Sequence, residues 1–195
     1  MGRTSTARER VLDAACSLIR SRGYEAVGVA EVCSVAEVRK GSFYYYFDSK
    51  QALTREVIRE HWRSERARWV AVLSTPGTPL ARLEALFDMQ ADDIRAEQKS
   101  NVVNGCIFAN LSLELSARDA SIRSDLESVF DEQIALVAEV LGEAVADGSL
   151  STDDTPDRLA SAMLAQLEGL VLFAKLRNDA SSLDGVWSQV RRLAS

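Results

Sequence analysis

The stretch KGSFYYYF, residues 40–47, places five consecutive aromatic side chains in an otherwise acidic protein. A β-strand is expected to alternate apolar and polar residues or to carry β-branched neighbours. Here Lys40, Gly41 and Ser42 precede the aromatic residues and Asp48 follows them, so the surrounding sequence has to distinguish a strand from a helix.

The composition favours an all-α fold. Ala, Leu, Arg and Glu dominate the 195 residues, and only three prolines and ten glycines interrupt them. No stretch approaches the roughly 20 uninterrupted apolar residues of a membrane span, and the N-terminus lacks the apolar region of a signal peptide. We therefore expect a cytoplasmic protein that has no membrane partner.

The charge is distributed unevenly along the chain. The net charge of −6 argues against indiscriminate binding of nucleic acids. Residues 1–62 nevertheless contain ten Lys and Arg against eight Asp and Glu, whereas residues 63–195 contain thirteen against twenty-one. A basic N-terminal part and an acidic remainder are predicted.

The N-terminal part has the pattern of a helix-turn-helix. A first helix is expected at residues 5–21, and the short apolar segment VAEVCSV is separated from RKGSFYYYF by two residues, Glu37 and Val38. A helix-turn-helix places its second helix in the major groove of DNA. Phe43 and Phe47 are four residues apart and are expected to face the core.

The other aromatic residues of this helix are left for DNA. The phenols of Tyr44, Tyr45 and Tyr46 can contact thymine methyl groups, sugars and phosphates. Lys40 and Lys50 bracket them with positive charge suited to the phosphate backbone.

Residues 8–58 resemble the N-terminal domain of TetR-type transcriptional regulators, through the motifs GVAEV, KGSFYYYF and SKQAL at the family's mutual spacing. The resemblance implies a three-helix DNA-binding domain over residues 1–48 and an effector-sensing and dimerisation domain over residues 49–195, with about nine helices in all. It also implies DNA contacts from a set of residues that comprises Gly28, Lys40, Gly41, Ser42, Tyr44, Tyr45, Tyr46 and Lys50.

Two positions depart from the family pattern. The turn usually has Gly where this chain has Glu37, and the recognition helix usually opens with a capping Ser or Thr where this chain has Arg39. Arg39 can bind a guanine through two hydrogen bonds, so we include it among the DNA-binding residues and expect it to alter the operator sequence.

Six further helices are expected after the recognition helix, near residues 49–73, 80–97, 103–115, 119–147, 157–178 and 183–194. The helix from Asp157 is apolar almost all round, which suggests an interface. The family resemblance implies a two-fold homodimer that uses the last two long helices and suits a palindromic operator. Its predicted interface residues are Leu164, Leu167, Gly169, Val171 and Trp187.

Enzymatic functions find little support. His61 is the only histidine, which excludes a histidine-clustered metal site and leaves a Ser or Cys nucleophile without its commonest base. No glycine-rich phosphate loop is present. We predict no enzyme activity, no cofactor and no metal.

The signal that the protein detects has two candidate chemistries. Cys16 and Cys33 lie on apolar helix faces as packing residues, whereas Cys106 follows a glycine near the start of a helix, where the positive helix end favours a thiolate. The segments GCIFANLSLEL and AKLRND resemble a branch of the family that senses electrophiles and oxidants and represses detoxifying reductases such as N-ethylmaleimide reductase. In that reading Lys175 lowers the pKa of Cys106 and traps its sulfenic acid as a sulfenamide; otherwise Lys175 is an ordinary lysine near a helix C-terminus.

The alternative signal is a reversible apolar or aromatic ligand between the helices, held by the side chains of Trp62, Trp69, Phe87, Phe108 and Phe130. These aromatic residues are equally suited to an ordinary core. A helical interaction module without DNA binding is the remaining class. The pattern as a whole predicts a homodimeric repressor that leaves its operator when the signal arrives.

Overall fold

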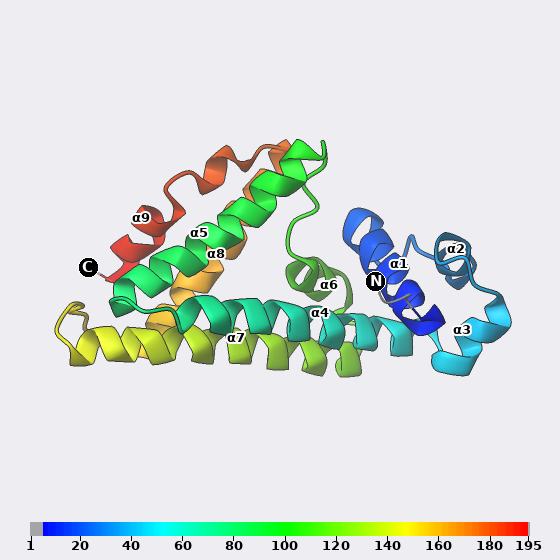
Figure 1. Cartoon of the computed structure of the whole chain (residues 1–195), viewed down its shortest axis with the longest axis horizontal. Coiled ribbons are helices and arrows are strands. Elements are labelled where there is room, and N and C mark those ends of the chain that lie inside the picture. The colour runs from blue at the N-terminus through cyan, green and yellow to red at the C-terminus, as the bar shows by residue number, and fades with distance from the viewer. Residues whose placement is uncertain (1–5, 195) are drawn as a thin grey trace. The chain divides into compact units, whose positions relative to one another are not determined.

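The computed structural model describes residues 6–194, and its secondary structure over that range is entirely helical (Figure 1). In chain order the α-helices of these residues are α1 (Ala7–Arg22), α2 (Val29–Val35), α3 (Lys40–Tyr46), α4 (Lys50–Leu73), α5 (Pro79–Lys99), α6 (Ile107–Leu115), α7 (Ala120–Ala146), α8 (Pro156–Arg177) and α9 (Val186–Arg191). Two 3₁₀ turns, η1 (Ala180–Leu183) and η2 (Arg192–Ala194), flank α9. The predicted all-α fold is confirmed.

The chain forms two compact units. One consists of the described residues up to Ser64 together with Ile107–Ser128, and the other of Glu65–Cys106 and the residues from Val129 onward. The chain passes from one unit to the other inside α4, between Cys106 and Ile107, and inside α7. The candidate sensor Cys106 therefore stands at a covalent junction between the units.

The first unit begins with a well-capped helix. The Thr6 hydroxyl accepts a hydrogen bond from the Glu9 N–H at 3.2 Å, and the Glu9 carboxylate accepts the Thr6 N–H at 2.8 Å, which together form a capping box. Gly23, with φ +83°, ends α1. The predicted start at Ser5 lies outside the described residues.

α6 and the first parts of α4 and α7 complete this unit. Asp119 caps α7 by accepting the N–H groups of Ser121 and Ile122, both at 3.0 Å, and these hydrogen bonds lower the pKa of Asp119 to about 2. Arg55 of α4 donates to Asp125 of α7 at 2.5 and 3.2 Å. Carboxylates thus fix both the start of α7 and its packing on α4.

The second unit contains α5, α8 and α9 packed together with η1. α5 and α8 begin in the same way, with a threonine whose hydroxyl accepts a backbone N–H and a proline in the first turn. α8 ends at Asn178 in the left-handed conformation, with φ 50°.

Two predicted helices differ from the observed ones. The helix expected at 103–115 begins only at Ile107, because Gly105 has φ +73° and the N–H groups of Asn104 and Gly105 bond to the Glu97 carboxylate instead of to the backbone. The helix expected at 183–194 is broken at Gly185, with φ +62°, into η1, α9 and η2.

α8 is unusually apolar on the outside. By length and composition alone it could cross a membrane, yet it belongs to the compact second unit, and 39% of its most apolar window is buried there. Leu172, Phe173 and Leu176 are exposed by 54%, 46% and 74%. These three residues are called the α8 apolar face below.

Candidate functional site

The helix-turn-helix is formed by α2, a four-residue turn and α3. The Ala36 N–H donates to the Val32 carbonyl at 2.9 Å and the Val38 N–H to the Cys33 carbonyl at 3.0 Å, which closes α2. Glu37, with φ 53°, supplies the left-handed residue of the turn. The chain therefore adopts the backbone of a glycine-containing turn with a glutamate in it, at some cost in strain.

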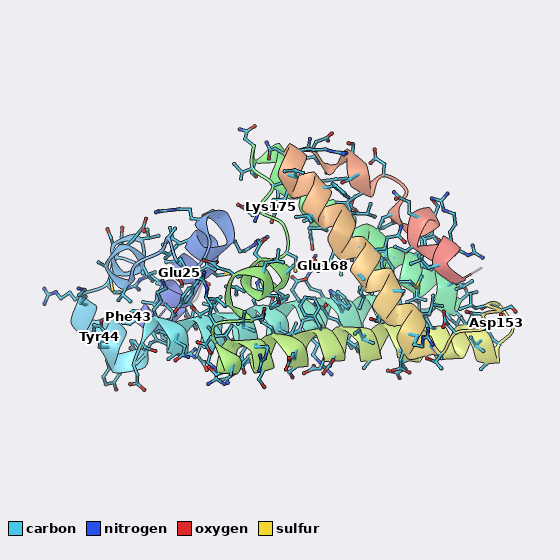
Figure 2. All side chains as sticks on the ribbon, turned by 180° about the vertical axis from the view of Figure 1, so that it is seen from behind. Glu25, Phe43, Tyr44, Asp153, Glu168 and Lys175 are labelled. Carbon is cyan, nitrogen blue, oxygen red and sulfur yellow. The ribbon has the colours of Figure 1, made fainter. Side chains whose placement is uncertain are left out.

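The aromatic run of α3 divides by helical spacing. Phe43 is fully buried and Phe47 is 3% exposed, with their ring centroids 5.7 Å apart, as predicted. Tyr44, Tyr45 and Tyr46 are exposed by 54%, 82% and 40%. The rings of Phe43 and Tyr44, both labelled in Figure 2, are 5.1 Å apart between centroids with their planes at 81°.

The remaining predicted DNA contacts lie around this helix. Gly28, Arg39, Lys40 and Gly41 are exposed and Ser42 is half-buried. Gly28 is the N-cap of α2 and Arg39 the N-cap of α3, and neither cap has a side-chain hydrogen bond. A backbone amide at each of these helix starts is thereby available to an anion.

Lys50 differs from the other predicted contacts because it already has an aromatic partner. Its ammonium lies 3.9 Å from the ring centroid of Tyr24. This contact joins the start of α4 to the turn after α1.

The turn after α1 is also bound by a carboxylate for which no role was predicted, that of Glu114. Glu114, on α6, accepts the N–H groups of Tyr24 and Glu25, each at 2.7 Å. A Cβ at Gly23 would lie 3.1 Å from its Oε2, so glycine makes the close approach possible. Nothing local marks Glu114, because its partners are 89 and 90 residues away in sequence.

The segment before α6 positions Cys106. Glu97 Oε2 accepts the N–H groups of Asn104 and Gly105 at 2.8 and 3.1 Å. The Asn178 side chain accepts the Val103 N–H at 2.8 Å and donates to the Asn101 carbonyl at 3.0 Å. The sensor segment, defined as residues 101–106, is thus attached to α5 and to the end of α8.

Lys175 lies against this segment. A Cβ at Gly105 would be 3.3 Å from Lys175 Cδ and 3.5 Å from a Val171 methyl group, so both side chains pack over the residue that precedes Cys106. Glu168, two turns earlier on α8, accepts a hydrogen bond from the Cys106 thiol. Burial raises the pKa of Glu168, and the thiol partly offsets that shift. Figure 2 shows Glu168 and Lys175 along α8.

The other two cysteines lie in the first unit. Burial raises the pKa of the Cys16 and Cys33 thiols, which disfavours the reactive thiolate. The Cys16 sulfur is 3.9 Å from Nδ1 of His61. In residues 6–194 no cluster of three His, Cys, Asp or Glu side chains is arranged to hold a metal ion.

The predicted ligand-pocket residues fall into both units. Trp62 packs against Phe108, with ring centroids 6.3 Å apart, whereas Phe87 packs against Trp187 at 6.0 Å in the second unit. Trp69 is buried and Phe130 half-buried. These ring contacts join Trp62 to Phe108 within the first unit and Phe87 to Trp187 within the second.

The predicted interface residues mostly belong to the core of a single chain. Leu164, Leu167, Val171 and Trp187 are 5–7% exposed, and Gly169 is half-buried. The exposed apolar residues of this helix are those of the α8 apolar face, because they occupy the opposite side of α8. Because α8 is apolar on nearly all sides, its sequence does not indicate which side packs inside the chain.

Known proteins share this arrangement over nearly the whole chain. Residues 11–57 match the model of bacterial regulatory proteins of the tetR family, and residues 79–190 match the tetracyclin repressor-like C-terminal domain. The transcriptional regulator AcuR of Cereibacter sphaeroides is 36% identical over 88% of this chain and 78% of its own length. An uncharacterized HTH-type transcriptional regulator in the lacX 3′ region of Lactococcus lactis is 33% identical over 91% of this chain and 87% of its own.

A third relative is the HTH-type transcriptional repressor NemR of Escherichia coli, 26% identical over 95% of this chain and 92% of its own. The crystal structure of its reduced form superposes with a TM-score of 0.87, at 27% identity over 97% of both chains. Together the fold, the exposed recognition helix and these relatives define a helix-turn-helix regulator of transcription that binds DNA and is not an enzyme. The chain belongs to the TetR family, and the predicted likeness to its NemR-type branch is confirmed.

The strained turn gives a stability prediction. Because Glu37 has φ 53°, glycine is tolerated there and a β-branched residue is not. We expect Glu37→Val to have an unfolding free energy about 1–2 kcal/mol below that of Glu37→Gly in urea titrations. The matched control is the pair Ser34→Val and Ser34→Gly at an exposed position inside α2. There Ser34→Gly is expected to have the lower unfolding free energy, because glycine has the lower helix propensity. The same order of stability at both positions would contradict the role assigned to the turn.

Proposed function

We propose that this protein is a transcriptional repressor that binds a palindromic operator as a homodimer and leaves it when Cys106 is modified. The observation that carries DNA recognition is the exposure of Tyr44, Tyr45 and Tyr46 on a helix anchored by buried Phe43. Repression is supported by the similarity to NemR, which is named a repressor.

Each predicted contact then has a role on DNA. The tyrosines contact sugars, thymine methyl groups and phosphates; Lys40, Gly41, Ser42 and Lys50 bind the backbone, and Arg39 reads a guanine. The uncapped amides at the start of α2, next to Gly28, take a phosphate. Residues 1–48 form the DNA-binding domain and residues 49–195 the sensing and dimerisation domain.

The homodimer uses the α8 apolar face. A two-fold interface places the same patch of each chain against its copy, so exposed Leu172, Phe173 and Leu176 are covered together. Two recognition helices can then meet half-sites spaced by about one turn of DNA, roughly 34–36 Å.

Cys106 is the proposed sensor, and Lys175 its partner. The Lys175 stem packs on Gly105, the residue before Cys106, and an amine that reaches Cys106 from there favours the thiolate by its positive charge. An oxidant such as hypochlorite converts the thiol to a sulfenic acid, and attack of the neutral amine on sulfur releases water and forms an S–N bond. An electrophile such as a maleimide instead adds directly to the sulfur.

Glu114 is the residue proposed to transmit the change. Cys106 directly precedes α6, and Glu114 near the end of α6 holds the backbone of Tyr24 and Glu25 between α1 and α2. A shift of α6 therefore displaces the turn that supports the helix-turn-helix. Weakening operator binding a hundredfold requires a coupling free energy of about 2.7 kcal/mol.

A reversible ligand is the second candidate signal. Within the described residues, Gln90 Nε2 on α5 and Gln166 Oε1 on α8 are buried without a hydrogen-bond partner. Buried polar atoms of this kind are where a ligand gains from pairing. Such a ligand would act equally on wild type and on a Cys106 variant.

The sensor proposal is tested by operator affinity before and after N-ethylmaleimide or mild hypochlorite. We expect the wild type to lose about a hundredfold in affinity and Cys106→Ser to lose less than about threefold. Reductant should restore affinity after hypochlorite but not after N-ethylmaleimide, because a thioether is not reducible. Equal losses in both proteins would place the signal elsewhere and favour the reversible ligand.

The dimer proposal is tested by sedimentation velocity. Leu176→Glu, which introduces a charge into the α8 apolar face, is expected to yield a monomer, because burying an unpaired carboxylate opposes association. The control is Leu113→Glu on α6, where leucine is 82% exposed and belongs to the other unit. A Leu176→Glu protein that remains dimeric at micromolar concentration would contradict this interface.

A further inference from the structure

The Glu168 carboxylate accepts a hydrogen bond from the Cys106 thiol, so its environment changes when the thiol proton is lost. Glu168 Oε2 is buried and has no hydrogen-bond partner within the described part of the chain. The Cys106 S–H is the donor that the Glu168 carboxylate does have. Loss of that proton would leave a buried carboxylate without a donor.

The surroundings do not offer an easy replacement. Glu168 lies on the same side of α8 as Lys175, but seven residues or two turns earlier, so the two are separated by about 10 Å along the axis. Three titratable groups contact the sensor segment: Glu97 on α5 accepts its amides, Glu168 on α8 accepts the Cys106 thiol, and the Lys175 side chain packs on Gly105. Glu97 is occupied by two backbone N–H groups.

We propose that Glu168 is the positioning residue that converts modification of Cys106 into a structural change, because alkylation of the sulfur, or formation of the S–N bond, leaves the Glu168 carboxylate without its thiol donor. This inference rests on the proposed function. It concerns how α8 responds to modification of Cys106, whereas the Cys106–Lys175 chemistry concerns the modification itself and α6 the link to the helix-turn-helix. A buried, unpaired carboxylate is unfavourable, so it either takes up a proton or moves toward water.

The chemistry balances with a maleimide as the electrophile. The sulfur forms a bond to one alkene carbon, the S–H bond breaks, and the other alkene carbon gains a proton, so alkylation of the thiol by itself consumes no net proton. Any fraction of Cys106 that is already a thiolate takes up a proton from solvent on alkylation, so Glu168 is reported by the part of the uptake that Glu168→Gln loses. Glu168 is expected to take up that part, because burial already raises its pKa before the thiol is lost.

The test is proton uptake during alkylation with N-ethylmaleimide, followed with an indicator dye in weakly buffered solution. We expect wild type to take up roughly half a proton per alkylated Cys106 at pH 6–7, because burial raises the pKa of Glu168 and loss of the thiol donor, which opposes that shift, raises it further. Glu168→Gln is expected to show clearly less uptake than wild type, because its amide does not titrate and only the thiolate fraction of Cys106 contributes. Cys106→Ser supplies the background from Cys16 and Cys33.

Glu97→Gln is the matched control, because Glu97 touches the same segment but keeps its two donors after alkylation. It should retain the wild-type uptake. Uptake below about 0.1 proton in wild type, or unchanged uptake in Glu168→Gln, would overturn the inference.

Operator binding separates this inference from the proposed function. Alkylated Glu168→Gln is expected to lose less than about tenfold in operator affinity, against about a hundredfold for wild type. A wild type that keeps its operator after alkylation refutes the proposed function, while the proton measurement still decides the role of Glu168. A hundredfold loss in both proteins refutes only the role of Glu168.

Discussion

The carboxylate of Glu114 accepts the N–H groups of Tyr24 and Glu25, both at 2.7 Å. Those two groups belong to the turn that leads from α1 into the helix-turn-helix, and a charged acceptor for backbone N–H groups is among the stronger hydrogen bonds in proteins. Gly23 is required beside it, because a side chain there would meet the carboxylate. A side chain outside the predicted DNA-binding surface thus attaches the turn between α1 and α2 to α6.

Carboxylates have more roles in this acidic protein than the sequence indicated. Glu97, Glu114 and Asp119 each accept two backbone N–H groups, at the sensor segment, at the turn after α1 and at the start of α7. From the sequence alone, the acidic residues were described only by their net charge. Several of them satisfy backbone groups that no helix or neighbouring strand could satisfy.

The local features were predictable from sequence because their causes are local. Phe43 and Phe47 are buried together since they are four residues apart, and the tyrosines between them are exposed for the same reason. Glu37 was singled out because the family usually has glycine at this position of the turn. In the structure Glu37 has a positive φ, the conformation that glycine adopts most easily.

The long-range features were not predictable in the same way. Glu114 contacts Tyr24, which is 90 residues away in sequence, and Glu168 on α8 contacts Cys106 before α6. No periodicity in the sequence encodes such pairs. The start of α6 was predicted too early. The N–H groups of Asn104 and Gly105 donate to the Glu97 side chain on α5, and no helix-start pattern in the sequence marks Glu97 as their acceptor. The covered side of α8 was ambiguous because both sides are apolar.

The most direct measurement of the account is a cycle that combines Cys106 alkylation with Glu114→Gln, read as operator affinity. Gln keeps one acceptor and turns an amide toward the second N–H, so the link between α6 and the turn is weakened. The alkylation-induced loss is predicted to fall from about a hundredfold in wild type to less than about tenfold in Glu114→Gln, and to stay near a hundredfold in Asp119→Asn, whose carboxylate caps α7 and accepts from Gln51 on α4 without contacting the turn after α1 in any hydrogen bond described above. An undiminished hundredfold loss in Glu114→Gln would contradict the account.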